Sequence, residues 1–527
     1  MLDKEQWEKF DLTIGRVYWR TSVPGRRPNN ANTSEPTEWA RQQKGNWGAV
    51  IEQGSDIFLL TDGPRSYPLL YARQYNKWLV SSSAEKMMAA LDSPRIDRHA
   101  ATEFAHTCFV LGNDTLISGV KSVPPASVLR LGANGTTQIY EHHSLMPTER
   151  LGLDHKDFFS LFHEKLLQSF AQLVEDANGR QLLVPLSGGA DSRLILTILH
   201  ELGASNVCAF SYGFPESKQA KISQEVAKGL GYPWLYISYG ADDVYRRWWR
   251  TSNNSFIQHC WTGLALPHIQ DWYALGDLRD RQDIADDAII LPGHTVVGCE
   301  HDDWCFDPEL NLGKKDMLKV LAKHHLSQQG NFRRALQNVR TREKLLIFLD
   351  KYWRNEDPST RSDVLAAFNL AERQAKYINN SMRGYEHFGF SWALPMLERD
   401  PWNVWINGEQ SVHDSARTAY LDYVNKKYSN QAGVSIGYWG VVNRLSPSVA
   451  CALQVLTKLG LRGAINRLFT AHVYMKHPMG FEGFAGGIPR WKLACNLYSG
   501  ASILGVFANL FLQEQWVPHQ HVLPPEV

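Results

Sequence analysis

Six consecutive residues have the composition of an anion-binding loop. They follow the apolar run 182–186 directly and precede a helical pattern that begins near Ser192. The loop consists of Ser187, Gly188, Gly189, Ala190, Asp191 and Ser192. Glycines permit a sharp turn that exposes main-chain N–H groups, and the start of a helix adds further N–H groups and a positive dipole end. We therefore expect pyrophosphate to bind here, with Leu186 at the entrance to the loop.

The polar side chains of this loop extend the same interpretation. Ser187 and Ser192 can donate hydroxyl hydrogen bonds to phosphate oxygens. Asp191 repels an anion unless it holds a magnesium ion that bridges the phosphates, so we assign Mg²⁺ to it. The alternative is an ordinary glycine turn with a capping Asp or Ser, which is common in α/β proteins.

The loop resembles one nucleotide-binding family and differs from two others. The Gly-Lys-Ser/Thr of a Walker A loop is missing, and the glycine spacing is not that of a dinucleotide fingerprint. The string is similar to the pyrophosphatase loop of the asparagine synthetase group, whose members split ATP between its α and β phosphates. ATP is the nucleotide that this resemblance implies. Ser211, Tyr212 and Gly213, at the end of the next expected strand, match the family segment whose backbone contacts adenine.

A second family motif is altered in this sequence. It follows the apolar run 289–291, where Gly293 and His294 join the expected nucleotide site. The resemblance predicts a second magnesium-binding Asp next, but Val296 and Val297 stand there. We assign the missing carboxylate to Glu300, with Asp302 and Asp303 as further candidates and a solvated surface charge as the alternative for each.

The resemblance also implies a late catalytic lysine, which stabilises the charge that develops on the activated carboxylate. Our candidate is Lys476, in the segment 474–481. The alternative is an ordinary surface lysine. Together with Asp191, Lys476 completes the set of expected catalytic residues.

The N-terminal region resembles a glutaminase domain that has lost its nucleophile. Residues 58–71 and 115–125 are similar to two segments of the glutaminase domain of asparagine synthetases. That family places a cysteine at position 2, where this chain has Leu2. Without that thiol, glutamine hydrolysis lacks its nucleophile. We therefore expect a degenerate domain with no glutaminase activity.

A third segment points to a subgroup of the family. Residues 385–395, preceded by Glu372 and Arg373, resemble synthetase-like proteins from bacterial surface-polysaccharide gene clusters. A sugar uronic acid is the carboxylate that this resemblance favours. The same aromatic residues also fit a segment of the hydrophobic core, and both interpretations can hold together.

The hydrophobic pattern predicts an α/β protein of two domains. Short β-rich runs fill the first 145 residues, with strands expected at 47–52, 57–61, 69–73, 78–81, 115–121 and 126–131. A helical pattern follows at 157–174, and strand, glycine turn, helix and strand alternate from residue 181. We assign residues 1–150 to the first domain and 151–527 to the second. The resemblance implies an Ntn-hydrolase-like αββα sandwich followed by a parallel-sheet, adenine-nucleotide α-hydrolase-like domain with a mostly helical end.

Composition narrows the range of partners. Lys and Arg number 55 against 54 Asp and Glu, so net charge does not favour a nucleic acid partner.

Seven cysteines form no Cys-x-x-Cys pair, and the first ten residues lack the apolar core of a signal peptide, so we expect a cytoplasmic protein. The uncharged stretch 493–512 is interrupted by polar residues, which favours a buried helix over membrane contact.

These observations predict a two-step, AMP-forming ligase. Its substrates are a small-molecule carboxylate and an amine or ammonia, the latter supplied by a separate glutaminase or another pathway enzyme. A homodimer remains open. Two alternatives also stay open: an amide-forming cyclase of the lasso-peptide or β-lactam type, and a non-catalytic nucleotide-binding scaffold.

Overall fold

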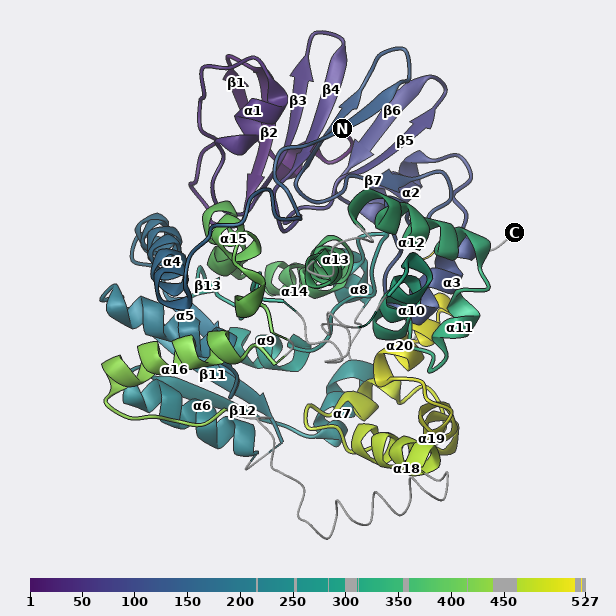
Figure 1. Ribbon diagram of the computed structural model, residues 1–527. Coiled ribbons are helices and arrows are strands. Elements are labelled where there is room, and N and C mark those ends of the chain that lie inside the picture. Colours follow the sequence, from purple (N-terminus) through teal and green to yellow (C-terminus); the bar gives the residue numbers. More distant parts are fainter. Residues whose placement is uncertain are drawn as a thin grey trace.

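The computed structural model contains two groups of strands, linked and covered by helices (Figure 1). The N-terminal strands lie at the top of the view, and the parallel strands β11 and β12 lie at the lower left. The structure describes residues 1–214, 217–250, 254–282, 284–298, 310, 312–353, 360–414, 416–438, 462–516 and 523.

The N-terminal region forms two antiparallel sheets. The larger has the order β1-β2-β3-β4-β8-β9 and the smaller β6-β5-β7. The larger sheet is formed by β1 (Glu8–Leu12), β2 (Gly15–Thr21), β3 (Trp47–Gln53), β4 (Asp56–Thr61), β8 (Ser127–Leu131) and β9 (Thr137–Glu141). The smaller is formed by β5 (Leu70–Gln74), β6 (Lys77–Ser81) and β7 (Lys121–Ser122). Beside them lie η1 (Lys4–Gln6), α1 (Pro36–Arg41), α2 (Ala84–Ala90) and α3 (Arg98–Thr107).

The central strands of the larger sheet are buried on both faces, whereas the edge strands β1 and β9 are mostly exposed. Along β3, Ala49 and Ile51 belong to a small core that also contains Trp39 of α1. Val50, which points to the opposite face, belongs to the main core of the protein. Strand residues alternate between faces, so one strand serves two cores.

The second group of strands is a parallel sheet with the order β12-β11-β10-β13-β14. Its strands are β10 (Leu182–Pro185), β11 (Val207–Gly213), β12 (Trp234–Ser238), β13 (Ile289–Ile290) and β14 (Ser391–Trp392). The neighbouring helices are α4 (His155–Ala177), α5 (Ala190–Glu201) and α6 (Lys218–Gly229). The predicted mixed α/β fold is confirmed. The Ntn-hydrolase-like and nucleotide-hydrolase-like assignments and the domain boundary remain predictions.

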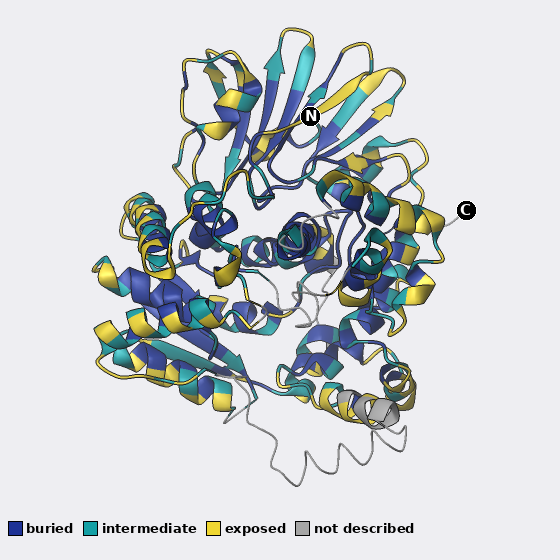
Figure 2. Ribbon diagram, in the orientation of Figure 1, coloured by how far each residue is buried: buried dark blue, intermediate teal, exposed yellow. Residues whose placement is uncertain are grey.

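Helices make up most of the remaining described chain. In the centre of the molecule, α13 and α14 are drawn mostly dark blue in Figure 2 because their side chains are largely buried. The helices are α7 (Ala241–Arg250), α8 (Asn254–Cys260), α9 (Trp272–Arg279), α10 (Lys314–His325), α11 (Phe332–Ala335), α12 (Val339–Tyr352), α13 (Thr360–Phe368), the π-helical η3 (Asn369–Ile378), α14 (Ser381–His387), η4 (Pro395–Leu397), α15 (Arg399–Ile406), η5 (Gln410–Val412), α16 (Thr418–Ala432), α18 (Arg462–Tyr474), η6 (Phe481–Ala485), α19 (Arg490–Tyr498) and α20 (Ile503–Leu512).

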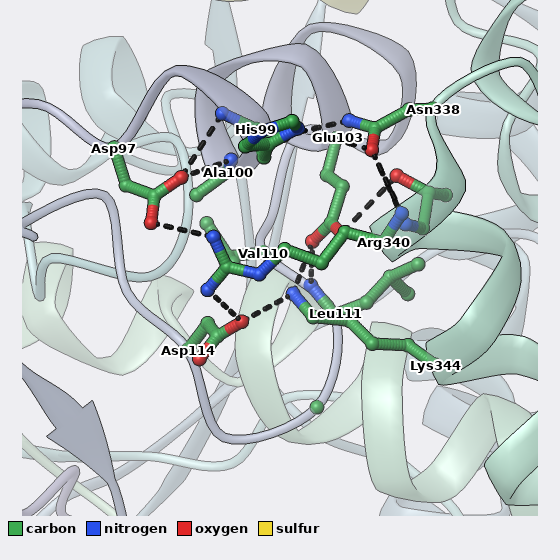
Figure 3. Close-up of polar contacts among 12 residues, drawn as sticks. Asp97, His99, Ala100, Glu103, Val110, Leu111, Asp114, Asn338, Arg340 and Lys344 are labelled. Atoms are coloured by element: carbon green, nitrogen blue, oxygen red, sulfur yellow. Dashed lines mark hydrogen bonds and ion pairs between the residues drawn. The ribbon is translucent and has the colours of Figure 1, made fainter.

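A buried polar network joins the N-terminal region to α12 (Figure 3). The Glu103 carboxylate of α3 is fully buried, and it accepts hydrogen bonds from Lys344 Nζ (2.7 Å) and from the Leu111 main-chain nitrogen (3.1 Å). Asp114 contacts Lys344 Nζ at 2.8 Å and Arg340 at 2.9 Å. Burial opposes ionisation of Asp114, but the neighbouring Lys121 and Lys344 hold the pKa of this carboxyl below its usual range.

The segment 385–395 connects the two groups of strands. Glu386 contacts Arg20 of β2 at 3.3 Å and Arg383 at 2.9 Å, and it accepts a 3.1 Å hydrogen bond from the Trp392 indole. Arg383 in turn donates to the Ser66 carbonyl at 3.1 Å. Tyr385, Phe390 and Trp392 are buried, so the core interpretation of this aromatic segment is confirmed. Glu386 holds β2 against β14.

Two sequence-based expectations were wrong. Residues 115–120 form a turn rather than a strand, because the Thr115 hydroxyl donates to the Ile117 and Val120 carbonyls and Gly119 adopts a φ of +78°. The stretch 493–512 is not one helix, because it is divided between α19 and α20 with a bend of 119° between them. Gly500 has a φ of +103°, and the Ser502 hydroxyl caps α20.

No single helix among the described residues is long and apolar enough to cross a membrane. The bent pair α19 and α20 meets that criterion only by combined length and composition. Most of α20 is buried inside the protein.

Candidate nucleotide site

The glycine loop lies between β10 and the start of α5, as its sequence predicts. Ser192, in the first turn of α5, accepts a 3.1 Å hydrogen bond from the Ser187 main-chain nitrogen, and the two hydroxyls lie 3.2 Å apart. The Ser187 hydroxyl also accepts from the Gly189 main-chain nitrogen at 3.2 Å. The two hydroxyls therefore accept from the main-chain N–H groups of Ser187 and Gly189, which could otherwise donate to a bound anion.

A cavity of about 230 Å³ opens beside this loop at the carboxyl ends of β10, β11 and β13. It is lined by six of the predicted nucleotide-site residues, which come from three separate strands: Leu186, Ser187, Ser211, Tyr212, Gly293 and His294. The carboxyl end of a parallel sheet is where open α/β folds bind their ligands. Contact of these residues with a nucleotide remains a prediction.

Hydrogen bonds fix the relative positions of the two central strands at this end. The Leu186 main-chain nitrogen donates to the Phe210 carbonyl at 2.7 Å. The Ser211 hydroxyl donates to the Leu186 carbonyl at 2.5 Å, and Ser223 of α6 donates to the same carbonyl at 3.0 Å. Ser211 therefore holds the loop entrance in place.

The chain segment that contains Lys476 reaches the end of β11. Gly213 has a φ of +125°, and a Cβ there would lie 2.8 Å from the Pro478 carbonyl oxygen. That carbonyl accepts a 2.9 Å hydrogen bond from the Phe214 main-chain nitrogen, and Met479 lines the cavity. Lys476 itself is exposed and does not line the cavity, so its catalytic role remains a prediction.

Asp191 is engaged by two residues at the start of α16. It accepts a 2.9 Å hydrogen bond from the Tyr420 hydroxyl, and both carboxylate oxygens lie 3.5 Å from Arg417 Nη1. Tyr420 is fully buried; burial and then the Asp191 charge raise the pKa of its phenol well above the usual value. Sequence reasoning missed both partners because they lie more than 220 positions along the chain and belong to no quoted motif.

The described donor set does not fit a magnesium ion. The Asp191 carboxylate is occupied by a hydroxyl and a guanidinium, and Val296 and Val297 are buried. Within the described part of the chain, no group of three or more His, Cys, Asp or Glu side chains gathers as metal ligands would. Glu300, the predicted replacement ligand, lies outside the described residues.

Further polar groups line the cavity that the sequence did not reveal. Asp271 accepts hydrogen bonds from the Tyr212 hydroxyl (2.6 Å) and the Tyr385 hydroxyl (2.7 Å), so it links β11 to α14. His268 also lines the cavity, together with the predicted His294. Burial lowers the pKa of His294 to about 4 and lowers that of His268 as well, so both imidazoles are neutral at pH 7.

The comparisons with known proteins bear on this part of the chain. Residues 162–252 match the family model described as asparagine synthase. This stretch is similar to an asparagine synthase domain. The match includes β10, the glycine loop, β11 and β12, and residues at the ends of β10 and β11 form one side of the cavity. No curated protein matches the chain. At the family level, the match supports an ATP-dependent ligase that forms amides.

Proposed function

We propose that this protein is an ATP-dependent carbon–nitrogen ligase that forms an amide through an AMP ester of its carboxylate substrate. One observation carries the proposal: Leu186, Ser187, Gly293 and His294 line one cavity at the carboxyl end of the parallel sheet. Such a position, with a glycine loop at a helix N-terminus, suits a nucleotide phosphate. The asparagine synthase match, which covers Leu186 and Ser187 but not Gly293 and His294, supports it.

The reaction has two balanced steps. A carboxylate oxygen of the substrate bonds to the α-phosphorus of ATP while the α–β bridging bond breaks, and pyrophosphate leaves. An amine nitrogen then bonds to the acyl carbon, AMP leaves, and the nitrogen gives up one proton. The glycine loop binds the departing pyrophosphate through main-chain N–H groups, once its oxygens replace the Ser187 and Ser192 hydroxyls as acceptors from the Ser187 and Gly189 nitrogens. Positioning and neutralisation of charge account for catalysis of this kind.

The amine comes from outside the chain. Leu2 offers no thiol for glutamine hydrolysis, and its main-chain nitrogen donates to the Val80 carbonyl at 2.7 Å. Ammonia from a separate glutaminase, or an amine substrate from another enzyme of the pathway, would serve. The resemblance of residues 385–395 favours a sugar uronic acid as the carboxylate, in cytoplasmic polysaccharide biosynthesis. The proposed ligase acts as a monomer or a homodimer.

A second candidate is a non-catalytic protein that binds nucleotide as a scaffold. Val297 favours it, because an apolar side chain stands where the resemblance predicts a metal-binding carboxylate. Catalysis separates the two candidates. A ligase exchanges radioactive pyrophosphate into ATP in the presence of its correct acid, and a scaffold binds ATP without exchange.

Titration calorimetry with ATP and with adenosine tests the assigned site. Gly189 is the N-cap of α5 with a φ of −86° and a ψ of −178°, and a Cβ there would meet only the Ser187 hydroxyl, at 3.1 Å. Both Asp and Asn are favourable N-cap residues, so Gly189→Asp and Gly189→Asn should both fold.

Only the aspartate adds a negative charge to the loop. We expect Gly189→Asp to weaken ATP binding about tenfold or more relative to Gly189→Asn, and to leave adenosine binding unchanged. Equal ATP affinities for the two variants would move the phosphate site away from this loop. An exchange assay with glucuronic and galacturonic acids, against amino acids, then tests the substrate class.

A further inference from the structure

Arg417 lies at the phosphate end of α5. Its guanidinium is 3.5 Å from both carboxylate oxygens of Asp191, which is in the first turn of that helix. The main-chain N–H groups of a helix's first turn lack partners within the helix, and those of α5 are the ones that would receive phosphate. Arg417 precedes α16, the helix that packs beside α5 (Figure 1).

The backbone at Arg417 is unusual. Its φ of 56° and ψ of 34° place a non-glycine residue in the left-handed region, at a cost of about 1 kcal/mol or more. The Asp414 side chain accepts a 2.7 Å hydrogen bond from the Thr418 nitrogen and fixes this turn. Such strained positions cluster at functional sites, where they aim a side chain.

The same arginine faces the altered metal motif. Arg417 and Val296 line a cavity of about 50 Å³, together with Gly298 of the loop that follows β13. Arg417 therefore contacts Asp191 and lines a cavity with Val296. The resemblance predicts a magnesium-binding carboxylate at each of these two positions. Here one of the carboxylates is gone, and an arginine cation lies beside the other.

We infer that Arg417 supplies the positive charge of this phosphate site, so that the chain binds a nucleotide triphosphate without a divalent cation. The inference rests on the proposed function, because it presumes that phosphate occupies the glycine loop. A guanidinium is planar, permanently charged and suited to bidentate contact with phosphate oxygens. It replaces part of the charge compensation that a metal ion gives a triphosphate, and Asp191 and Tyr420 hold it in position.

Calorimetry of ATP and adenosine binding, in EDTA and in Mg²⁺, tests the inference. We expect ATP affinity in EDTA to lie within about threefold of that in Mg²⁺. Arg417→Gln should weaken ATP binding about tenfold or more and leave adenosine binding unchanged, because adenosine has no phosphate. Arg417→Lys keeps the charge but not the planar guanidinium, so its ATP affinity should lie between those of the wild type and Arg417→Gln.

The matched control is Lys426→Gln, which removes one positive charge from an exposed position on the same helix. A strict requirement for Mg²⁺ overturns the inference, and so does an Arg417→Gln variant no weaker for ATP than the control. In either case ATP still binds and the proposed function stands. If neither ATP nor adenosine binds the folded wild-type chain, the proposed function fails and the inference with it. A thermal melt of each variant shows whether it has folded.

Discussion

Gly293 packs so closely against Ser192 that a Cβ at position 293 would lie 3.2 Å from the Ser192 main-chain nitrogen and 3.4 Å from the Asp191 Cβ. The loop after β13 therefore rests directly on the start of α5. A small residue at position 293 keeps the third wall of the cavity against the glycine loop. This contact joins two segments that are about a hundred positions apart in the sequence.

A larger residue at position 293 should push these two segments apart. We expect Gly293→Val to lower the free energy of unfolding by about 1–3 kcal/mol, as overpacking does, and to weaken ATP binding severely. Gly298→Val is the matched control, because a Cβ at Gly298 meets nothing within 4 Å. Urea unfolding and calorimetry check both variants. Equal effects at the two positions would argue against the close contact.

Removal of the Asp191 carboxylate should abolish ATP–pyrophosphate exchange. The choice of substitution matters, because Asp191→Ala removes the acceptor of the buried Tyr420 hydroxyl, at a cost of about 1–3 kcal/mol. Asp191→Asn keeps a carbonyl acceptor and removes only the charge. We expect no exchange in either variant, with a clearly lower unfolding midpoint only for Asp191→Ala. Exchange at the wild-type rate in Asp191→Asn would contradict a role for this charge.

The purified chain should release no glutamate from glutamine. Leu2 stands where the glutaminase resemblance places a cysteine, so this position offers no thiol to act as nucleophile. A glutamate dehydrogenase-coupled assay measures the release directly. Glutamine hydrolysis that persists in Leu2→Ala, after purification to homogeneity, would place a nucleophile elsewhere in the chain.

The sequence predicted the parts of the site that local patterns encode. An apolar strand, two glycines and a helix pattern are all within 25 residues, so the loop and α5 follow from hydrophobic spacing and turn chemistry. Asp271 and Arg417 were missed because a hydrogen bond or ion pair across the fold leaves no local signature. The turn at Thr115 was missed because its β-branched and apolar residues satisfy a strand pattern equally well.

The histidines should make the protein less stable in mild acid. Burial lowers the pKa of His143 to about 3, whereas an unfolded chain gives about 6.5. Between these values the unfolded state binds a proton that the folded state does not, so the His143 contribution is fully present above pH 6.5 and is lost as pH falls. The slope reaches about 1.4 kcal/mol per pH unit.

The variant His143→Gln isolates this contribution. Its urea unfolding, measured from pH 7 to pH 4 beside the wild type, should show a shallower loss of stability with acid. Nε2 of His143 lies 2.8 Å from the Asn403 side-chain oxygen, a contact that the glutamine amide can replace. Parallel curves for the two proteins would mean that His143 is protonated in the folded state.

The Glu103–Lys344 pair of Figure 3 should contribute strongly to the attachment of α12. Glu103 is fully buried, and Lys344 Nζ also contacts the Asp114 carboxylate at 2.8 Å. The variant Lys344→Met therefore leaves buried negative charge without its cation. We expect the free energy of unfolding to fall by about 3 kcal/mol. The control is Lys319→Met, because the ion pair of Lys319 with Asp316 is exposed. This variant should change the free energy of unfolding by less than about 1 kcal/mol.

A double variant separates the charge effect from lost packing. Glu103→Gln keeps an acceptor for the Leu111 nitrogen but removes the buried charge that Lys344 neutralises. If the charge pair dominates, the double variant Glu103→Gln/Lys344→Met should be less destabilised than the sum of the single variants, with a coupling energy of about 1–3 kcal/mol. Additive effects would instead assign the lost stability to packing of the lysine side chain. The Asp114–Arg340 ion pair would then be the main polar contact between α12 and the N-terminal region.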